Sequence, residues 1–130
     1  MKLSKSSFNT DSYNELFAGC KKLKILEQNF ETSEGIGFSK VFYGCEELTS
    51  LNLSNWNVFN SNQFISTFEG CKKLKTLNIN NWQSKFAVQI QNMFKDCESL
   101  TDLNLSNFTT AITFEMSEMF SGCKALKSLD

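Results

Sequence analysis

Apolar residues recur along this chain at fixed offsets from evenly spaced cysteines. The separations between these cysteines are 25 residues once and 26 residues thereafter. The anchors are Cys20, Cys45, Cys71, Cys97 and Cys123. A phenylalanine lies three residues before each cysteine, and leucines lie three and six residues after it. A constant period of about 20 to 50 residues is typical of a solenoid, in which position within the repeat decides the role of each residue.

The segment before each cysteine carries the apolar spacing of a short helix. Phe64, Thr67, Phe68 and Cys71 stand at i, i+3, i+4 and i+7, and the other repeats follow the same offsets. A glycine, or Asp96 in the fourth repeat, precedes the cysteine and is expected to end the helix in the left-handed conformation. The predicted helices cover residues 12–18, 36–43, 62–69, 88–95 and 114–121.

After the cysteine the apolar period changes to two, which is typical of a strand with one buried face. Leu74-x-x-Leu77-x-Ile79 is one example. The predicted strands cover residues 50–53, 76–79 and 102–105, with weaker ones at 25–27 and 127–129. We therefore predict an α/β fold, a leucine-rich-repeat solenoid with one short parallel strand and one short helix per repeat. It forms a single domain over residues 1–130, with 1–12 as a degenerate lead-in and the last repeat truncated.

Three further repeat positions carry structural expectations. Asparagines after the strands, such as Asn81, predict a buried ladder that satisfies backbone groups of adjacent coils. The aromatic residue that follows, such as Trp82, is expected to fill the core beneath a loop. The cysteines are expected to be reduced and mostly buried, in a column beside the phenylalanines, because they share the apolar face.

Composition narrows the class of protein. The chain has 13 basic and 14 acidic residues, a net charge of −1 and no histidine. This balance argues against a nucleic-acid partner. Lysines recur at the turn after the cysteine and could form a basic strip, but Glu46, Glu47 and Glu98 interrupt it. We find neither a signal peptide nor an apolar run long enough for membrane insertion.

The segment from Phe42 to Trp56 reads F-x-G-C-x-x-L-x-x-L-N-L-S-N-W, and it resembles the BspA-like leucine-rich-repeat family of surface proteins. The resemblance covers about residues 13–130. It implies a cell-surface or secreted parent protein, commonly an adhesin or binding protein. The resemblance implies no catalytic residue in this chain.

The residues themselves also predict no enzyme and no cofactor. Without histidine the chain has no Ser-His or Cys-His pair and no His-ligated metal, and it has no glycine-rich phosphate loop. What the repeats offer is a polar, nearly uncharged strand face, because residues next to the inward leucines point outward. This candidate binding face comprises Ser50, Asn52, Ser54, Thr76, Asn78, Asn80, Asp102, Asn104 and Ser106.

Two functions fit this face. The first is a binding module that contacts a protein or glycan ligand, and the second is a structural spacer that presents another domain. The last strand is expected to expose Leu126 and Leu129 on one flank. An uncovered strand edge favours weak end-to-end self-association.

Overall fold

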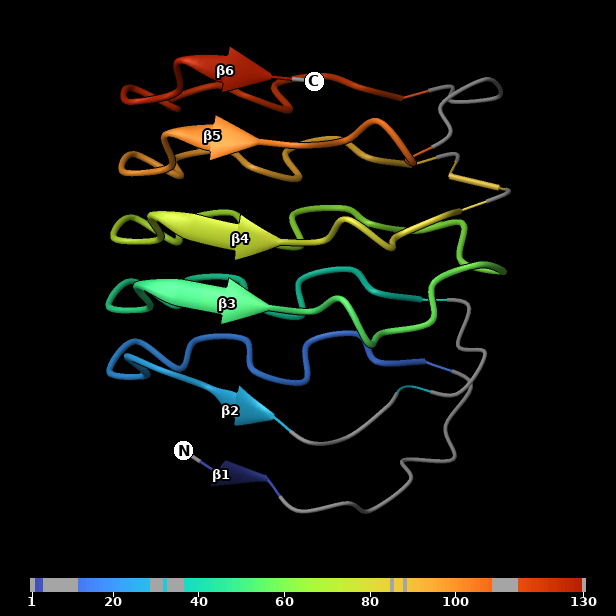
Figure 1. Ribbon diagram of the computed structural model, residues 1–130, viewed down its shortest axis with the longest axis horizontal. Helices are drawn as coiled ribbons and strands as arrows, with labels where there is room; N and C mark the ends of the chain where they lie inside the picture. Colours follow the sequence, from blue (N-terminus) through green and yellow to red (C-terminus); the bar gives the residue numbers. More distant parts are fainter. Residues whose placement is uncertain are drawn as a thin grey trace.

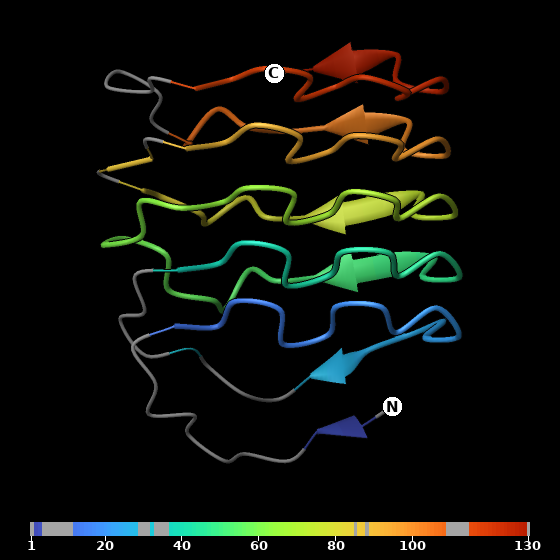
Figure 2. The ribbon, with the colours of Figure 1, turned by 180° about the vertical axis from the view of Figure 1, so that it is seen from behind.

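The computed structural model describes residues 2–3, 12–28, 32, 37–84, 86–87, 89–108 and 115–129. Six short strands lie in these ranges. They are β1 (Lys2–Leu3), β2 (Glu27–Gln28), β3 (Ser50–Asn52), β4 (Thr76–Asn78), β5 (Asp102–Leu103) and β6 (Ser128–Leu129). Figures 1 and 2 show them one above the other and pointing the same way, each at the start of one coil of the chain.

Consecutive coils pair in parallel at equivalent repeat positions. The three two-stranded sheets are β1–β2, β3–β4 and β5–β6. In β3–β4, Ser50 lies opposite Thr76 and Leu51 opposite Leu77, an offset of one repeat. A second line of parallel bridges joins Gly37, Gln63, Gln89 and Glu115 on another side of each coil. The predicted parallel strand pairing is therefore observed.

The predicted helices are wrong. No helix occurs among the described residues, and each predicted range is a succession of turns; residues 36, 88 and 114 of those ranges lie outside the described part. An α-helix needs each N–H to donate to the carbonyl four residues earlier. Here the amide of Phe68 donates to the carbonyl of Met93 in the next coil, at 2.9 Å. The described part of the fold is thus a helix-free stack of coils with short parallel strands, and the α/β class predicted from the sequence is incorrect.

Positive φ angles explain why the helix does not form. Ser66 has φ +55° and Gly70 has φ +76°, and both positions are left-handed in every repeat described. A left-handed residue every fourth position reverses the chain before a second helical turn can close. The N–H groups of Ser66, Phe68 and Gly70 then point to the next coil, while those between them close tight turns within their own coil.

Glycine is suited to the second left-handed position because it adopts positive φ without a steric penalty. Space does not require it at Gly70, where a Cβ would make an ordinary contact of 3.5 Å with the Cα of Gly44 in the coil below. Asp96 takes this conformation with φ +58°, so the predicted conformation holds although no helix ends there.

The core is a set of side-chain columns parallel to the stack axis. Neighbouring phenylalanine rings stack with centroids 5.3 to 5.7 Å apart and interplanar angles of 13° or less. The column consists of Phe17, Phe42, Phe68, Phe94 and Phe120. Trp82 is 1 % exposed and donates its indole N–H to the carbonyl of Leu53 at 3.0 Å. The prediction that this aromatic position fills the core is confirmed.

The asparagine ladder lies on the surface rather than in the interior. Asn81 Nδ2 donates to the carbonyl of Ser54 at 3.3 Å, and Asn107 Nδ2 donates to that of Asn80 at 2.7 Å. Both asparagines are exposed. The predicted link between coils is present, but its predicted burial is wrong because the aromatic residue takes the interior position.

The cysteines are free, and three of them, Cys45, Cys71 and Cys97, are buried. Cys20 is exposed and Cys123 is half-buried. The thiol of Cys71 donates to the carbonyl of Phe42 in the coil below at 3.2 Å, and the other buried thiols repeat this contact. The predicted column is therefore observed, with its first member open to solvent.

Two further predictions concern the membrane and the end of the stack. No helix that could cross a membrane is found among the described residues. Leu129 is 49 % exposed and Leu126 is half-buried. End-to-end self-association stays a prediction.

Candidate functional site

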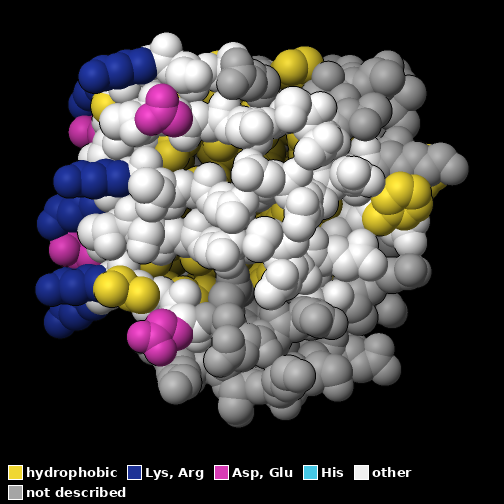
Figure 3. Space-filling model, viewed as in Figure 1, with side chains coloured by type: hydrophobic (Ala, Val, Ile, Leu, Met, Phe, Trp, Pro, Cys, Tyr) yellow, Lys and Arg dark blue, Asp and Glu magenta, His cyan; other side chains and the backbone are white. Residues whose placement is uncertain are grey.

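Stacking brings the predicted polar residues onto one face of the coils. Of the nine residues, Ser54 and Asn78 are half-buried and the others are exposed. Ser50 and Asn52 lie in register with Thr76 and Asn78 through the pairing of β3 with β4. Figure 3 shows this strand face as a largely uncharged surface, with lysines gathered along one edge.

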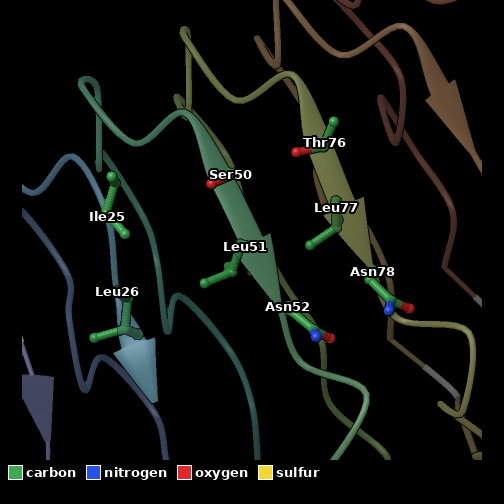
Figure 4. A pocket seen from close by; sticks show the side chains of 8 residues that line it. All are labelled: Ile25, Leu26, Ser50, Leu51, Asn52, Thr76, Leu77 and Asn78. Carbon is green, nitrogen blue, oxygen red and sulfur yellow. The ribbon is translucent and has the colours of Figure 1, made fainter.

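A shallow groove of about 330 Å³ crosses β3 and β4 on this face. Figure 4 shows Ser50 and Thr76 side by side where the strands begin, and Asn52 and Asn78 side by side where they end. Leucines lie between the two polar rows. The full lining is Ile25, Leu26, Ser50, Leu51, Asn52, Thr76, Leu77 and Asn78. The groove therefore has an aliphatic floor between a row of hydroxyl groups and a row of carboxamides.

Local hydrogen bonds hold the carboxamides in place. Asn52 Oδ1 accepts from the backbone amide of Ser54 at 3.1 Å, and Asn78 Oδ1 accepts from that of Asn80 at 3.2 Å. Asn104 makes the same contact with Ser106 at 2.9 Å. This turn fixes the plane of each side chain, which reduces the entropy lost when a ligand binds it.

The hydroxyl groups of the groove, in contrast, are not held by such hydrogen bonds. No side-chain hydrogen bond occupies the hydroxyl groups of Ser50 and Thr76 within the described part of the chain. Each hydroxyl can both donate and accept. The two rows together form an uncharged hydrogen-bonding site.

The sequence prediction missed the apolar part of the groove. Ile25 is 53 % exposed and Leu77 is half-buried, although the leucine positions were expected to point inward. Ile25 pairs with Ser50, so it occupies the outward column of the first coil. The signal for this was the residue type at the fifth position after the cysteine, where the first repeat has Ile25 and the next two have Ser50 and Thr76.

The lysine-rich turn after the cysteine forms a column of ion pairs. Its members alternate in sign from coil to coil: Lys21, Glu46, Lys72, Glu98 and Lys124. Glu46 lies 3.3 Å from Lys21 and 3.4 Å from Lys72, and Glu98 lies 3.2 Å from Lys124. The hydrogen bond from Lys21, together with the charge of Lys72, lowers the pKa of the Glu46 carboxyl. The glutamates that interrupt the basic strip in the sequence thus form ion pairs with its lysines.

A second groove of about 270 Å³ runs beside this column. Its floor is the glycine column Gly19, Gly44 and Gly70, and Asp96 lies at the same position in the fourth coil. Lys21, Glu46 and Lys72 form one side and are engaged in ion pairs with one another, and Glu69 also lines the groove.

Among the described residues, no group of three His, Cys, Asp or Glu side chains lies where it could hold a metal ion. Burial raises the pKa of Cys71 well above its ordinary value, and it raises that of Cys45 to about 12. A protonated thiol is a poor nucleophile, so these buried thiols are unreactive at neutral pH. The site can bind by hydrogen bonds and apolar contact.

These features define a class of protein, a repeat protein whose stacked coils present a groove on one strand face. The family model described as "Mycoplasma protein of unknown function, DUF285" matches residues 7–129, and the chain belongs to that family. No curated protein and no solved structure matches the chain.

Proposed function

We propose that the chain is a non-enzymatic binding module that contacts a protein or glycan through the strand face, within a cell-surface or secreted adhesin-type protein related to the BspA-like repeat proteins. The observation that carries the proposal is the groove across β3 and β4, where matched polar rows flank an aliphatic floor. Repetition supports the same idea. The two adjacent coils supply equivalent pairs of groups, so contacts with one ligand add up along the stack without a specialised loop.

A structural spacer is the second candidate. A spacer needs the ion-pair column and the core, but it has no need of an apolar floor open to water. Leu77 supplies such a floor between the polar rows, and exposed Ile25 adds an apolar group at the end of the hydroxyl row. The contrast favours the binding module.

The test is a double substitution in the groove, Thr76→Ala with Asn78→Ala. The probes are a printed array of neutral and acidic glycans and a set of purified extracellular-matrix glycoproteins, with the labelled chain in solution. We expect saturable binding to at least one probe and a loss of affinity of about tenfold or more in the double variant, because each lost hydrogen bond contributes about 0.5–1.5 kcal/mol.

The matched control is Asn62→Ala with Ser121→Ala, which removes one carboxamide and one hydroxyl from exposed positions outside the groove. This variant should bind as the parent chain does. A chain that binds no probe, or one whose binding is equally reduced by both double variants, would support the spacer instead.

A further inference from the structure

We infer that the groove over β3 and β4 takes an uncharged glycan of about two sugar units, lying along the stack axis. This inference rests on the proposed binding function and names the ligand class for the same groove. Three features of the groove support the inference: its charge, the placement of its polar rows and the hydrogen bonding of its backbone.

The lining of the groove gives a charged ligand no partner, and its two ends along the stack axis are acidic, whereas exposed Lys24 and Lys75 border the edge where the strands begin. None of its eight lining residues is charged, so a charged ligand would find no counter-ion there. The outward position of the next strand is held by exposed Asp102, and Glu27 follows Leu26 on the opposite side. Acidic groups at both ends repel a carboxylate or a sulfate.

The polar rows match the chemistry of a sugar. A sugar ring carries hydroxyl groups on its edges and C–H groups on its faces. Ser50 and Thr76 can exchange hydrogen bonds with one edge, the carboxamides of Asn52 and Asn78 can serve the other, and Leu77 lies between them. The aliphatic floor would contact the C–H face.

The repeat distance also fits. Paired strands lie roughly 5 Å apart, which is about the length of one hexose in a linear glycan. The register Ser50↔Thr76 and Asn52↔Asn78 would therefore present the same two groups to successive sugars. The outward column has Ile25 before Ser50 and Asp102 after Thr76. Within the described stack, only two coils therefore supply a hydroxyl group together with a carboxamide, so we expect the ligand to span two sugar units.

An extended peptide is the less suitable ligand because the backbone of this face is occupied. β3 pairs with β4 along its length. On either side of the paired residues, Lys75 N donates to Thr49 O at 2.9 Å and Leu53 N donates to Asn78 O at 2.9 Å. A peptide that adds as a strand needs unpaired backbone groups. On this face a ligand can form hydrogen bonds with side chains and not with the backbone.

The experiment is an NMR titration of the isotope-labelled chain with three neutral disaccharides (cellobiose, maltose and diacetylchitobiose) and with one acidic disaccharide that contains glucuronic acid. We expect saturable shifts centred on residues 50–52 and 76–78 with at least one neutral disaccharide. We expect binding of the acidic disaccharide to be at least tenfold weaker. Thr76→Val, which removes the hydroxyl at similar volume, should weaken neutral binding about tenfold, whereas Thr101→Val outside the groove should not.

Asp102→Asn tests the charge argument separately. This variant should bind the acidic disaccharide several-fold more tightly and the neutral one unchanged. The inference is overturned if none of the neutral disaccharides gives saturable shifts, or if the acidic one binds as well as the best neutral one. If these sugars fail while Thr76→Ala with Asn78→Ala still abolishes binding to a matrix protein, the binding function stands and the glycan inference falls. If no probe of either kind binds, both fall.

Discussion

Replacing Phe68 with alanine is expected to lower the free energy of unfolding by about 4 kcal/mol, in the usual range for a buried Phe→Ala change. The Phe68 ring is fully buried and stacks between Phe42 at 5.7 Å and Phe94 at 5.5 Å. Removing it opens a cavity in the middle of the column and separates the coils on both sides. Urea denaturation followed by tryptophan fluorescence measures the change, since Trp82 lies 6.0 Å from the Phe68 ring.

The control for this substitution is Phe59→Ala. Phe59 is 49 % exposed, so its loss should change the unfolding free energy by about 0.5 kcal/mol or less. Equal effects of the two substitutions would show that the phenylalanine column is not the core of the fold.

Raising the pH from 8 to 10 is expected to remove about 4 kcal/mol of stability, because three buried thiols must stay protonated in the folded chain. Desolvation raises the pKa of Cys45 from 9.0 to about 12, and it also raises the pKa values of Cys71 and Cys97. Below pH 9 the thiols are protonated in both states and the folded chain loses nothing. Above pH 9 the unfolded chain releases these protons and the folded chain does not, which favours unfolding by about 1.4 kcal/mol per thiol and pH unit. The loss continues until the pH reaches the folded-state pKa values.

Denaturation curves at pH 8, 9 and 10 measure this loss, and Cys71→Ala is the control. The variant has one buried thiol fewer, so its stability should fall by about 3 kcal/mol over the same interval. A thiol reagent at pH 8 should label exposed Cys20 quickly and Cys71 only after denaturation. Stability that does not depend on pH, or rapid labelling of native Cys71, would contradict the buried column.

Part of this fold could be predicted because equivalent positions have the same structural role in successive repeats. Equivalent positions one repeat apart were expected to pair in parallel, and Leu51 lies opposite Leu77. The burial of Trp82 and the left-handed conformation at Gly70 also followed from residue type and position. These features depend on local chemistry that recurs in every coil.

The helices were wrongly predicted because two structures share one apolar pattern. The offsets of Phe64, Thr67, Phe68 and Cys71 suit a helix, but they equally place side chains inward from consecutive tight turns. What decides between them is Ser66, whose φ of +55° has no signature in the side chain. The next coil stabilises this conformation, because the backbone carbonyl of Gln91 accepts a hydrogen bond from the amide of Ser66 at 3.0 Å. A contact between coils thus overrides a local preference.

The polar rows of the groove could be predicted, and its floor could not. Asn52 and Asn78 followed from the alternation of the strands. Leu77 is half-buried, although Leu51 and Leu103 at the equivalent positions of the neighbouring coils are buried. This difference has no signature in the residue type. The outward position of Ile25, in contrast, is visible from its place five residues after Cys20, the offset that Ser50 has from Cys45.

The amide of Phe68 provides the most direct test of the helix-free coil stack on which the groove depends. In a uniformly labelled sample, NMR couplings across hydrogen bonds identify the carbonyl that accepts each amide proton. The stack predicts a coupling from Phe68 to the carbonyl of Met93, in the next coil. A coupling from Phe68 to the carbonyl of Phe64, four residues earlier, is the pattern of a helix and would contradict the account.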